Sequence, residues 1–104
     1  MIVDRRTFIA KPGKGGKMKE MLIELFEKNP WPGGNLRIYT SHIGPFNHVI
    51  VKSESESLTA FEQAQTEFEQ GFGKADIDMD TWHEIEVSAS TQMWKLAYER
   101  RIED

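Results

Sequence analysis

The stretch that most constrains the fold of this chain runs from Asn35 to Lys52. Two runs rich in β-branched and aromatic residues, Leu36–Ser41 and His48–Val51, flank the segment Ile43–Asn47, which contains a Gly-Pro pair. Glycine accepts a positive φ and proline fixes φ at a turn corner, so this pair is typical of a turn. Two strand-like runs joined in this way predict an antiparallel hairpin. We expect the hairpin to form the middle of a sheet whose outer strands come from the two ends of the chain.

Length and composition narrow the class of protein. A chain of 104 residues with 38% hydrophobic residues is predicted to form one domain, spanning residues 1–104, with a real core. Its net charge of −4 argues against a nucleic-acid partner, which needs a clustered basic surface. The chain has no cysteine, which excludes disulfides, thiol catalysis and Cys-ligated zinc. Without a signal sequence or an apolar run near the roughly 20 residues of a membrane helix, we expect a cytoplasmic protein with no membrane partner.

The first third of the chain predicts a strand followed by a helix. Ile2–Lys11 favours a strand that ends at a Pro-Gly pair. In Met18–Phe26 the apolar residues occupy positions 18, 21, 22, 25 and 26, which is helical spacing with charged residues on the opposite side. The proline- and glycine-rich segment Asn29–Gly34 ends this helix.

The segment after the hairpin predicts a second helix. Ser53–Ser57 alternates serine with glutamate, which suits a helix N-terminus because hydroxyls cap the first turn and carboxylates oppose the helix dipole. A row at 3-4-3-4 spacing then predicts an amphipathic helix that buries one leucine and three phenylalanines: Leu58, Phe61, Gln65, Phe68 and Phe72. Gly71 and Gly73 mark its end.

The C-terminal third leaves two interpretations open. Thr81-x-x-Glu84 resembles a capping box, and Trp82, Ile85 and Ala89 share a helical face, which predicts a short third helix. Residues 82–87 also alternate in part, which is typical of a strand. After an acidic loop at residues 76–80 and this segment, residues 93–98 predict the last strand, with Trp94, Leu96 and Tyr98 on one face.

The element order is therefore β-α-β-β-α-(α)-β, which predicts a ferredoxin-like α+β sandwich. We expect strands joined through a helix to pair in parallel, and the helices to gather on one side of the sheet. The other face of the sheet then needs cover. A set of five residues looks too apolar for one covered face alone: Ile38, Val49, Val51, Trp94 and Leu96.

Three segments carry a resemblance to the NIPSNAP family of dimeric α+β barrel proteins. Residues 5–14 (RRTFIAKPGK) resemble the opening strand of that family, and residues 39–51 (YTSHIGPFNHVIV) resemble its Gly-Pro-hydrophobe-Asn turn and the strand that follows; Trp82 and residues 93–96 match loosely. The resemblance covers residues 5–98. At the end of the third strand, family members often carry His-Leu-Trp, whereas this chain has Val51-Lys52-Ser53. Any role that the family gives to that histidine is therefore absent from this chain or carried by another residue. The resemblance implies a homodimer that packs the uncovered faces of its two sheets together.

Two loop motifs are considered and set aside. Residues 13–17 (GKGGK) lie between a strand and a helix but lack the spacing of a phosphate loop and its following Ser or Thr, so a plain connection is favoured. Residues 76–80 (DIDMD) open like a calcium loop, but position six is Thr81 and position twelve is Val87, so a solvated acidic loop is favoured. No metal or cofactor is predicted.

The hairpin histidines are the candidates for chemistry. A three-residue loop centred on Pro45 would place His42 opposite His48, where the pair could relay a proton or hold a metal. A change of register by one residue would separate them. His83 is a weaker candidate. We name His42, His48, Asn47 and Tyr39 as the residues to carry catalysis if there is any.

The aromatic residues are most simply core or interface side chains, with a small-molecule pocket as the alternative. The predicted ligand-binding residues are Arg37, Tyr39, His48, Trp31 and Trp94. Arg37 and Asn47 would orient a carbonyl or phenolate. No Ser/His/Asp set has recognisable spacing.

Two functions are weighed. The preferred one is a small homodimeric protein that binds an apolar or aromatic molecule and has no chemistry of its own. The alternative, by analogy with other dimeric α+β barrels, is a cofactor-independent monooxygenase or isomerase acting on a small aromatic or quinone-like substrate. In that case a histidine would take the substrate proton, while Asn47 and Arg37 would steady the anion.

Overall fold

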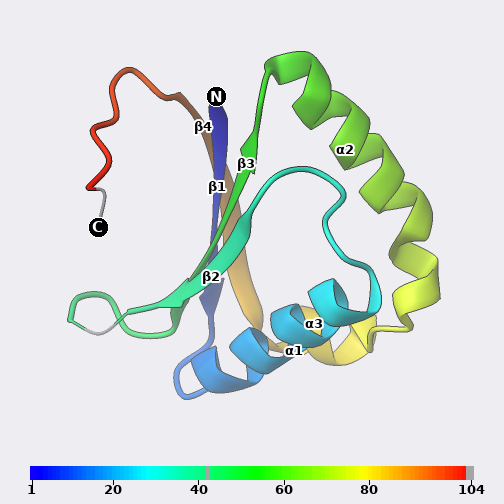
Figure 1. The fold of residues 1–104 in the computed structure, drawn as a ribbon. Coiled ribbons are helices and arrows are strands. Elements are labelled where there is room, and N and C mark those ends of the chain that lie inside the picture. The colour runs from blue at the N-terminus through cyan, green and yellow to red at the C-terminus, as the bar shows by residue number, and fades with distance from the viewer. Residues whose placement is uncertain (42, 103–104) are drawn as a thin grey trace.

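A computed structural model describes residues 1–41 and 43–102 of the chain. The predicted α+β order is confirmed, with a single 3-10 turn, η1, added after the second helix (Figure 1). The elements are β1 (Ile2–Ala10), α1 (Gly15–Lys28), β2 (Leu36–Thr40), β3 (His48–Ser55), α2 (Leu58–Gly71), η1 (Phe72–Ala75), α3 (Met79–Ile85) and β4 (Glu86–Lys95). None of the helices in these ranges is long and apolar enough to span a membrane.

The four strands form one sheet in the order β2-β3-β1-β4, and every neighbouring pair is antiparallel. The hairpin prediction is confirmed, but its place in the sheet was wrong. β1 lies inside the sheet, and the edges are β2 and β4. Parallel pairing through a helix was also wrong. β3, which continues from β2 in the hairpin, lies between β1 and β2, so the two strands joined by α1 are not neighbours.

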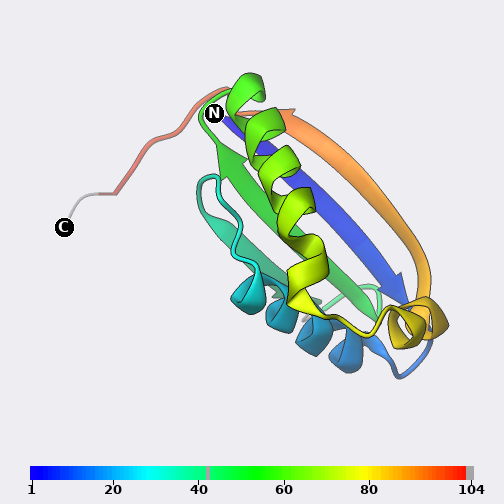
Figure 2. The same ribbon diagram turned by 90° about the vertical axis from the view of Figure 1, so that its right-hand side faces the viewer.

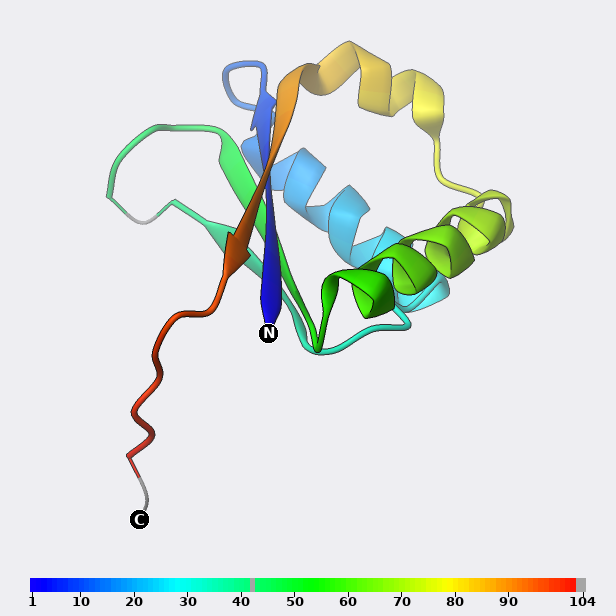
Figure 3. The same cartoon turned by 90° about the horizontal axis from the view of Figure 1, so that it is seen from above.

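All helices lie on one side of the sheet, with α2 running across it and α1 beside it (Figure 2). The C-terminal segment leaves from the opposite side, as the view from above also shows (Figure 3). Because side chains alternate along a strand, the sheet has a covered face toward the helices and an open face. The covered face holds Asp4, Arg6, Phe8, Ala10, Leu36, Ile38, Val49, Val51, Ser53 and Ser55. The open face holds Val3, Arg5, Thr7, Ile9, Arg37, Tyr39, His48, Ile50, Lys52, Glu54, Ser90, Gln92 and Trp94.

The main core lies between the covered face and α1. Val49 and Val51 of β3 are buried against Met18, Met21 and Leu22 of α1, which occupy one helical face as their spacing predicts. Ile38 packs against the same cluster. The sequence suggested that Ile38, Val49 and Val51 belong to a set too apolar for one covered face of the sheet to hold. For these three residues the expectation was wrong, because all three lie on the face that the helices cover.

Helix α2 begins where a capping side chain is available. The Ser57 hydroxyl accepts a hydrogen bond from the backbone N–H of Ala60 at 3.1 Å. Ser53 and Ser55, which we expected to help with capping, belong to β3 and are buried. Leu58 is 51% exposed, so the expectation that it is buried was wrong.

Both interpretations of the C-terminal third hold over part of their range. Helix α3 ends at Ile85 and strand β4 starts at the next residue. The helix is capped by Asp78, whose Oδ1 accepts from the Thr81 N–H at 3.1 Å, so the proposed Thr81 capping box was wrong. The strand starts at Glu86, well before position 93, and ends at Lys95, which leaves Leu96 and Tyr98 beyond it.

Candidate functional site

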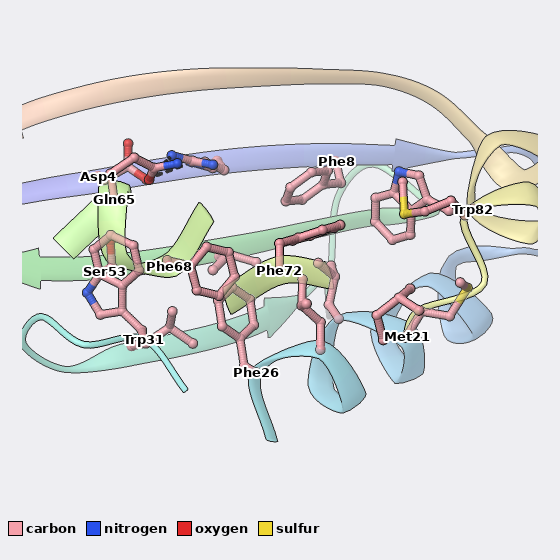
Figure 4. Close-up of a pocket in the computed structure, with 17 residues that line it drawn as sticks. Asp4, Phe8, Met21, Phe26, Trp31, Ser53, Gln65, Phe68, Phe72 and Trp82 are labelled. Atoms are coloured by element: carbon pink, nitrogen blue, oxygen red, sulfur yellow. Dashed lines mark hydrogen bonds and ion pairs between the residues drawn. The ribbon is translucent and has the colours of Figure 1, made fainter. Parts of the chain in front are cut away.

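A cavity of about 230 Å³ lies between the covered face and the helices (Figure 4). β1 and β3 form its floor, while α1, α2 and the segment leading into α3 form its walls. Most of its lining is apolar. Six of the lining residues are aromatic: Phe8, Phe26, Trp31, Phe68, Phe72 and Trp82.

The aromatic rings of the lining pack against one another. The Phe26 and Phe68 rings stack with their centroids 5.2 Å apart, and the Trp31 ring lies 5.8 Å from Phe68. Phe8 and Trp82 meet edge to face at 5.5 Å. Such pairs add about 0.5–1.5 kcal/mol to the burial of the rings and hold them in defined positions. The apolar wall is therefore a fixed surface.

A polar cluster made of Asp4, Arg6 and Gln65 lies at one end of the cavity. Arg6 Nε donates to Asp4 Oδ2 at 3.0 Å, and Arg6 Nη2 donates to Gln65 Oε1 at 2.7 Å. Figure 4 shows Asp4 and Gln65 at the opposite end from Trp82 and Met21. The cavity thus has one polar end and one apolar end.

Asp4 is the unusual member of the cluster. Asp4 is only 3% exposed, and its Oδ1 has no hydrogen-bond partner among residues 1–41 and 43–102. Burial raises the pKa of the Asp4 carboxyl, and the charge and hydrogen bond of Arg6 oppose that rise. A buried carboxyl with a raised pKa, in a cavity, is typical of functional sites.

The predicted ligand-binding residues divide between the two faces of the sheet. Trp31 lines the cavity. Arg37, Tyr39, His48 and Trp94 lie on the open face, away from the cavity. There Arg37 Nη1 pairs with Glu54 Oε1 at 3.0 Å, and Lys52 Nζ lies 5.8 Å from the centre of the Tyr39 ring.

The other candidates come from the hairpin connection and α3. Asn47 has a φ of 62°, and its Oδ1 accepts from the Gly15 N–H at 3.2 Å, so it ties the connection to the start of α1. His42 lies outside the described residues. β2 ends at Thr40 and β3 begins at His48, so the connection is longer than the three-residue loop on which the histidine pairing depended. His83 is exposed on α3.

Sequence reasoning missed the polar cluster. One signal was present, because Gln65 interrupts the row of phenylalanines on the buried side of α2. Asp4 and Arg6 gave no comparable signal, since β1 carries charges at three consecutive positions and its faces cannot be told apart by pattern alone. Within residues 1–41 and 43–102 there is no group of three acidic or histidine side chains arranged to hold a metal ion.

Comparison with known proteins identifies relatives in fold. No protein-family profile matches the sequence, and no curated protein matches it significantly. Among solved structures, protein Atu4242 from Agrobacterium tumefaciens, described as a NIPSNAP family protein of unknown function, gives a TM-score of 0.77 at 18% identity over 93% of this chain and 94% of that chain. An uncharacterised NIPSNAP domain protein from Burkholderia xenovorans gives 0.70 at 15% identity over 98% and 100% of the two chains.

A third solved structure widens the range of similar proteins. A putative antibiotic biosynthesis monooxygenase from Deinococcus radiodurans gives a TM-score of 0.70 at 12% identity over the full length of both chains. At these identities the likeness concerns the fold. The chain therefore has the ferredoxin-like α+β fold that solved NIPSNAP proteins share with this monooxygenase-like protein, and the resemblance noted in the sequence is confirmed at that level.

Proposed function

We propose that this protein binds a small, mainly apolar or aromatic molecule in the cavity between its sheet and helices, without chemistry of its own. The observation that carries the proposal is the cavity itself, with a braced aromatic wall and a single polar end. An apolar cavity of about 150 Å³ is large enough for benzene. The volume of about 230 Å³ therefore suits one substituted ring or a short chain.

The lining of the cavity favours an occupant over simple loose packing. Apolar side chains around an unfilled hollow lose the contacts that they would make in a packed core. A bound molecule with an apolar surface would restore part of these contacts.

Native mass spectrometry of freshly purified protein tests the proposal, because it reports a retained molecule directly. Filling the cavity supplies a variant for comparison. Leu25 of α1 lines the cavity, whereas Ile23 of the same helix is 38% exposed and lies outside the lining. Leu25→Phe should lose the retained molecule, and Ile23→Phe should keep it. Equal occupancy in both variants would contradict the proposed site.

A second candidate is a cofactor-independent monooxygenase or isomerase acting on a small aromatic or quinone-like substrate. Two observations favour it: the buried Asp4 carboxyl in the cavity, and a fold shared with a protein described as a putative antibiotic biosynthesis monooxygenase. Asp4 would then accept a proton from the substrate. The test is to look for oxygen uptake with a simple hydroquinone, or for isomerisation of the substrate without oxygen uptake. Either activity, if Asp4→Asn abolishes it, would support this candidate over pure binding.

We further propose that two copies pair through their open faces. The open face exposes Tyr39 and Trp94, and beyond β4 the C-terminal segment carries Tyr98 and Ile102, which are 80% and 95% exposed. This segment stands away from the body of its own chain (Figure 1), where a second copy could cover it. Light scattering should give the mass of a dimer, and Trp94→Asp should shift it to a monomer. A monomeric parent protein at micromolar concentration would contradict the pairing.

A further inference from the structure

We propose that a small divalent oxyanion, such as phosphate, binds at the centre of the open face and is enclosed there when two copies pair through that face. This inference rests on the pairing proposed above and adds the chemistry of a group held between the two sheets. The residues that would hold the anion are Arg5, Arg37 and Lys52. They lie on the opposite side of the sheet from the cavity.

Three cationic side chains form one row across the open face. In the antiparallel register, Lys52 of β3 lies directly across from Arg5 of β1 on one side and from Arg37 of β2 on the other. Gln92 of β4, which lies across from Arg5, ends the row without a charge. Side chains that lie directly across from each other have Cβ atoms about 4.5–5.5 Å apart. Arg5, Lys52 and Arg37, the basic row, therefore concentrate positive charge in one small area.

The open face supplies little negative charge to balance the basic row. Arg37 Nη1 pairs with Glu54 Oε1 at 3.0 Å. Within residues 1–41 and 43–102, Arg5 and Lys52 form no ion pair. The paired strand positions of this face carry three cations and one carboxylate, which is a net charge of +2 with histidine neutral. Because the whole chain has a net charge of −4, this excess of positive charge is local to the open face.

Two side chains of the basic row are held in place by neighbours on the same face. Lys52 Nζ lies 5.8 Å from the centre of the Tyr39 ring, and Arg37 is held by its ion pair with Glu54. A guanidinium group has five N–H donors in a planar fork that matches an oxyanion, and the ion pair with Glu54 leaves most of the donors of Arg37 available. The basic row therefore offers partly ordered donors to an anion.

Pairing of two copies makes a bound anion favourable. Each copy brings an open face with the same positive charge, and like charges placed together across an interface oppose association. A charge that becomes buried without a partner is strongly unfavourable. Tyr39 and Trp94 favour contact between the faces, whereas the basic row opposes it. An anion bound at the basic row removes this conflict, because it neutralises the positive charge as the faces come together.

The extent of the basic row limits the size of the anion. The row crosses three strands, which is about 10 Å at the usual spacing between strands. The next row on the same face is uncharged, because it consists of Tyr39, Ile50, Thr7 and Ser90. An extended polyanion such as a nucleic acid needs a larger basic surface and would be repelled by the net charge of −4 of the chain. A small oxyanion meets neither obstacle.

Dissociation of the pair in phosphate and in chloride tests the inference on the unmodified protein. Sedimentation equilibrium over a dilution series gives the dimer Kd in two buffers of equal pH and ionic strength. An anion present at about ten times its own Kd lowers the dimer Kd by about 10-fold through linkage, and we expect this with phosphate at about 10 mM. If the pair does not dissociate on dilution, the urea midpoint gives the same comparison, because an anion that binds only the folded pair raises it.

Two variants that each remove one lysine locate the effect. Lys52→Met removes the central cation of the basic row. This variant should pair more tightly than the parent protein in chloride, because repulsion is reduced, and phosphate should improve its dimer Kd by less than about 2-fold. The matched control is Lys74→Met, which removes an exposed lysine of η1 on the side of the helices. It should keep the phosphate response of the parent protein.

The outcomes separate this inference from the pairing on which it rests. Equal dimer Kd values in phosphate and in chloride overturn the anion site and leave the pairing intact. An equal phosphate response in Lys52→Met and Lys74→Met indicates a general effect of the salt and overturns the anion site as well. If the parent protein stays monomeric in both buffers, the pairing and the anion site are overturned together, while binding in the cavity is unaffected.

Discussion

The two faces of the sheet use adjacent residues of β1 in opposite ways. Arg6, on the covered face, donates hydrogen bonds to the buried Asp4 and to Gln65 at one end of the cavity. Arg5, on the open face, lies across from Lys52 and Gln92 in the neighbouring strands. The chemistry of the two side chains is the same, and only the surroundings differ. The comparison teaches that an arginine of β1 becomes part of the candidate site only when its side chain lies on the face that the helices cover.

The largest expected difference between the two sides concerns apolar burial. Phe68 is 8% exposed and packs against Phe26 and Trp31, whereas Phe46, in the connection that projects on the open side (Figure 1), is 88% exposed. Phe68→Ala should lower the free energy of unfolding by about 3–5 kcal/mol. Phe46→Ala should change it by less than about 0.5 kcal/mol. Urea denaturation of both variants measures the contrast, and similar losses would show that the two sides are packed alike.

The two arginines give the next contrast. Arg6→Met removes the partner of a buried carboxylate and should cost about 1–3 kcal/mol of stability. Arg5→Met, on the open face, should stay within about 0.5 kcal/mol. Thermal unfolding with matched buffers checks both. A larger loss for Arg5→Met than for Arg6→Met would mean that the covered cluster does not stabilise the fold as described.

The smallest effect is a pH dependence that belongs to Asp4. Burial raises the pKa of Asp4 above its ordinary value of 3.8, so over a range above pH 3.8 the folded protein keeps a proton that the unfolded chain has lost. Stability from this site is greatest below pH 3.8 and falls as pH rises through the raised pKa. Asp4→Asn should therefore gain stability relative to the parent protein as pH rises, by no more than about 1.4 kcal/mol per pH unit, and then level off.

Unfolding free energies of the two proteins, measured at matched pH values from mildly acidic to neutral, give this difference. The other carboxylates titrate in both proteins and cancel in the comparison. A relative gain for the parent protein with rising pH would indicate that Arg6 lowers the pKa of Asp4 overall, and the description of the polar end would then be wrong.

The order of the elements could be predicted because each carries a local signal. The apolar spacing of residues 18–26 marked α1, and the Gly-Pro turn between two β-branched runs marked the hairpin. The middle of β4 carried no such signal. Residues 88–92 read Ser-Ala-Ser-Thr-Gln, and they form a strand because their backbone pairs with β1, which requires no apolar side chains.

The candidate site could be predicted only in part, because its position depends on long-range pairing. Of the predicted ligand-binding residues, Trp31 lies in the lining of the cavity. Asp4 was not predicted, since its burial depends on the placement of β1 inside the sheet and on α2 lying over it. Tyr39 and Trp94 were assigned to a pocket on their chemistry, but alternation along their strands places them on the open face.

The most direct test of the account is to observe where a ligand binds, and side-chain methyl groups provide probes on both sides of the sheet. Met21 and Ile77 line the cavity, whereas Ile50 lies on the open face. NMR of protein labelled at the methionine and isoleucine methyl groups, titrated with 4-ethylphenol, should show shifts and intermolecular NOEs at Met21 and Ile77 and no NOEs at Ile50. NOEs confined to Ile50, or none at any labelled methyl group at saturating probe, would contradict the assignment of the cavity as the binding site.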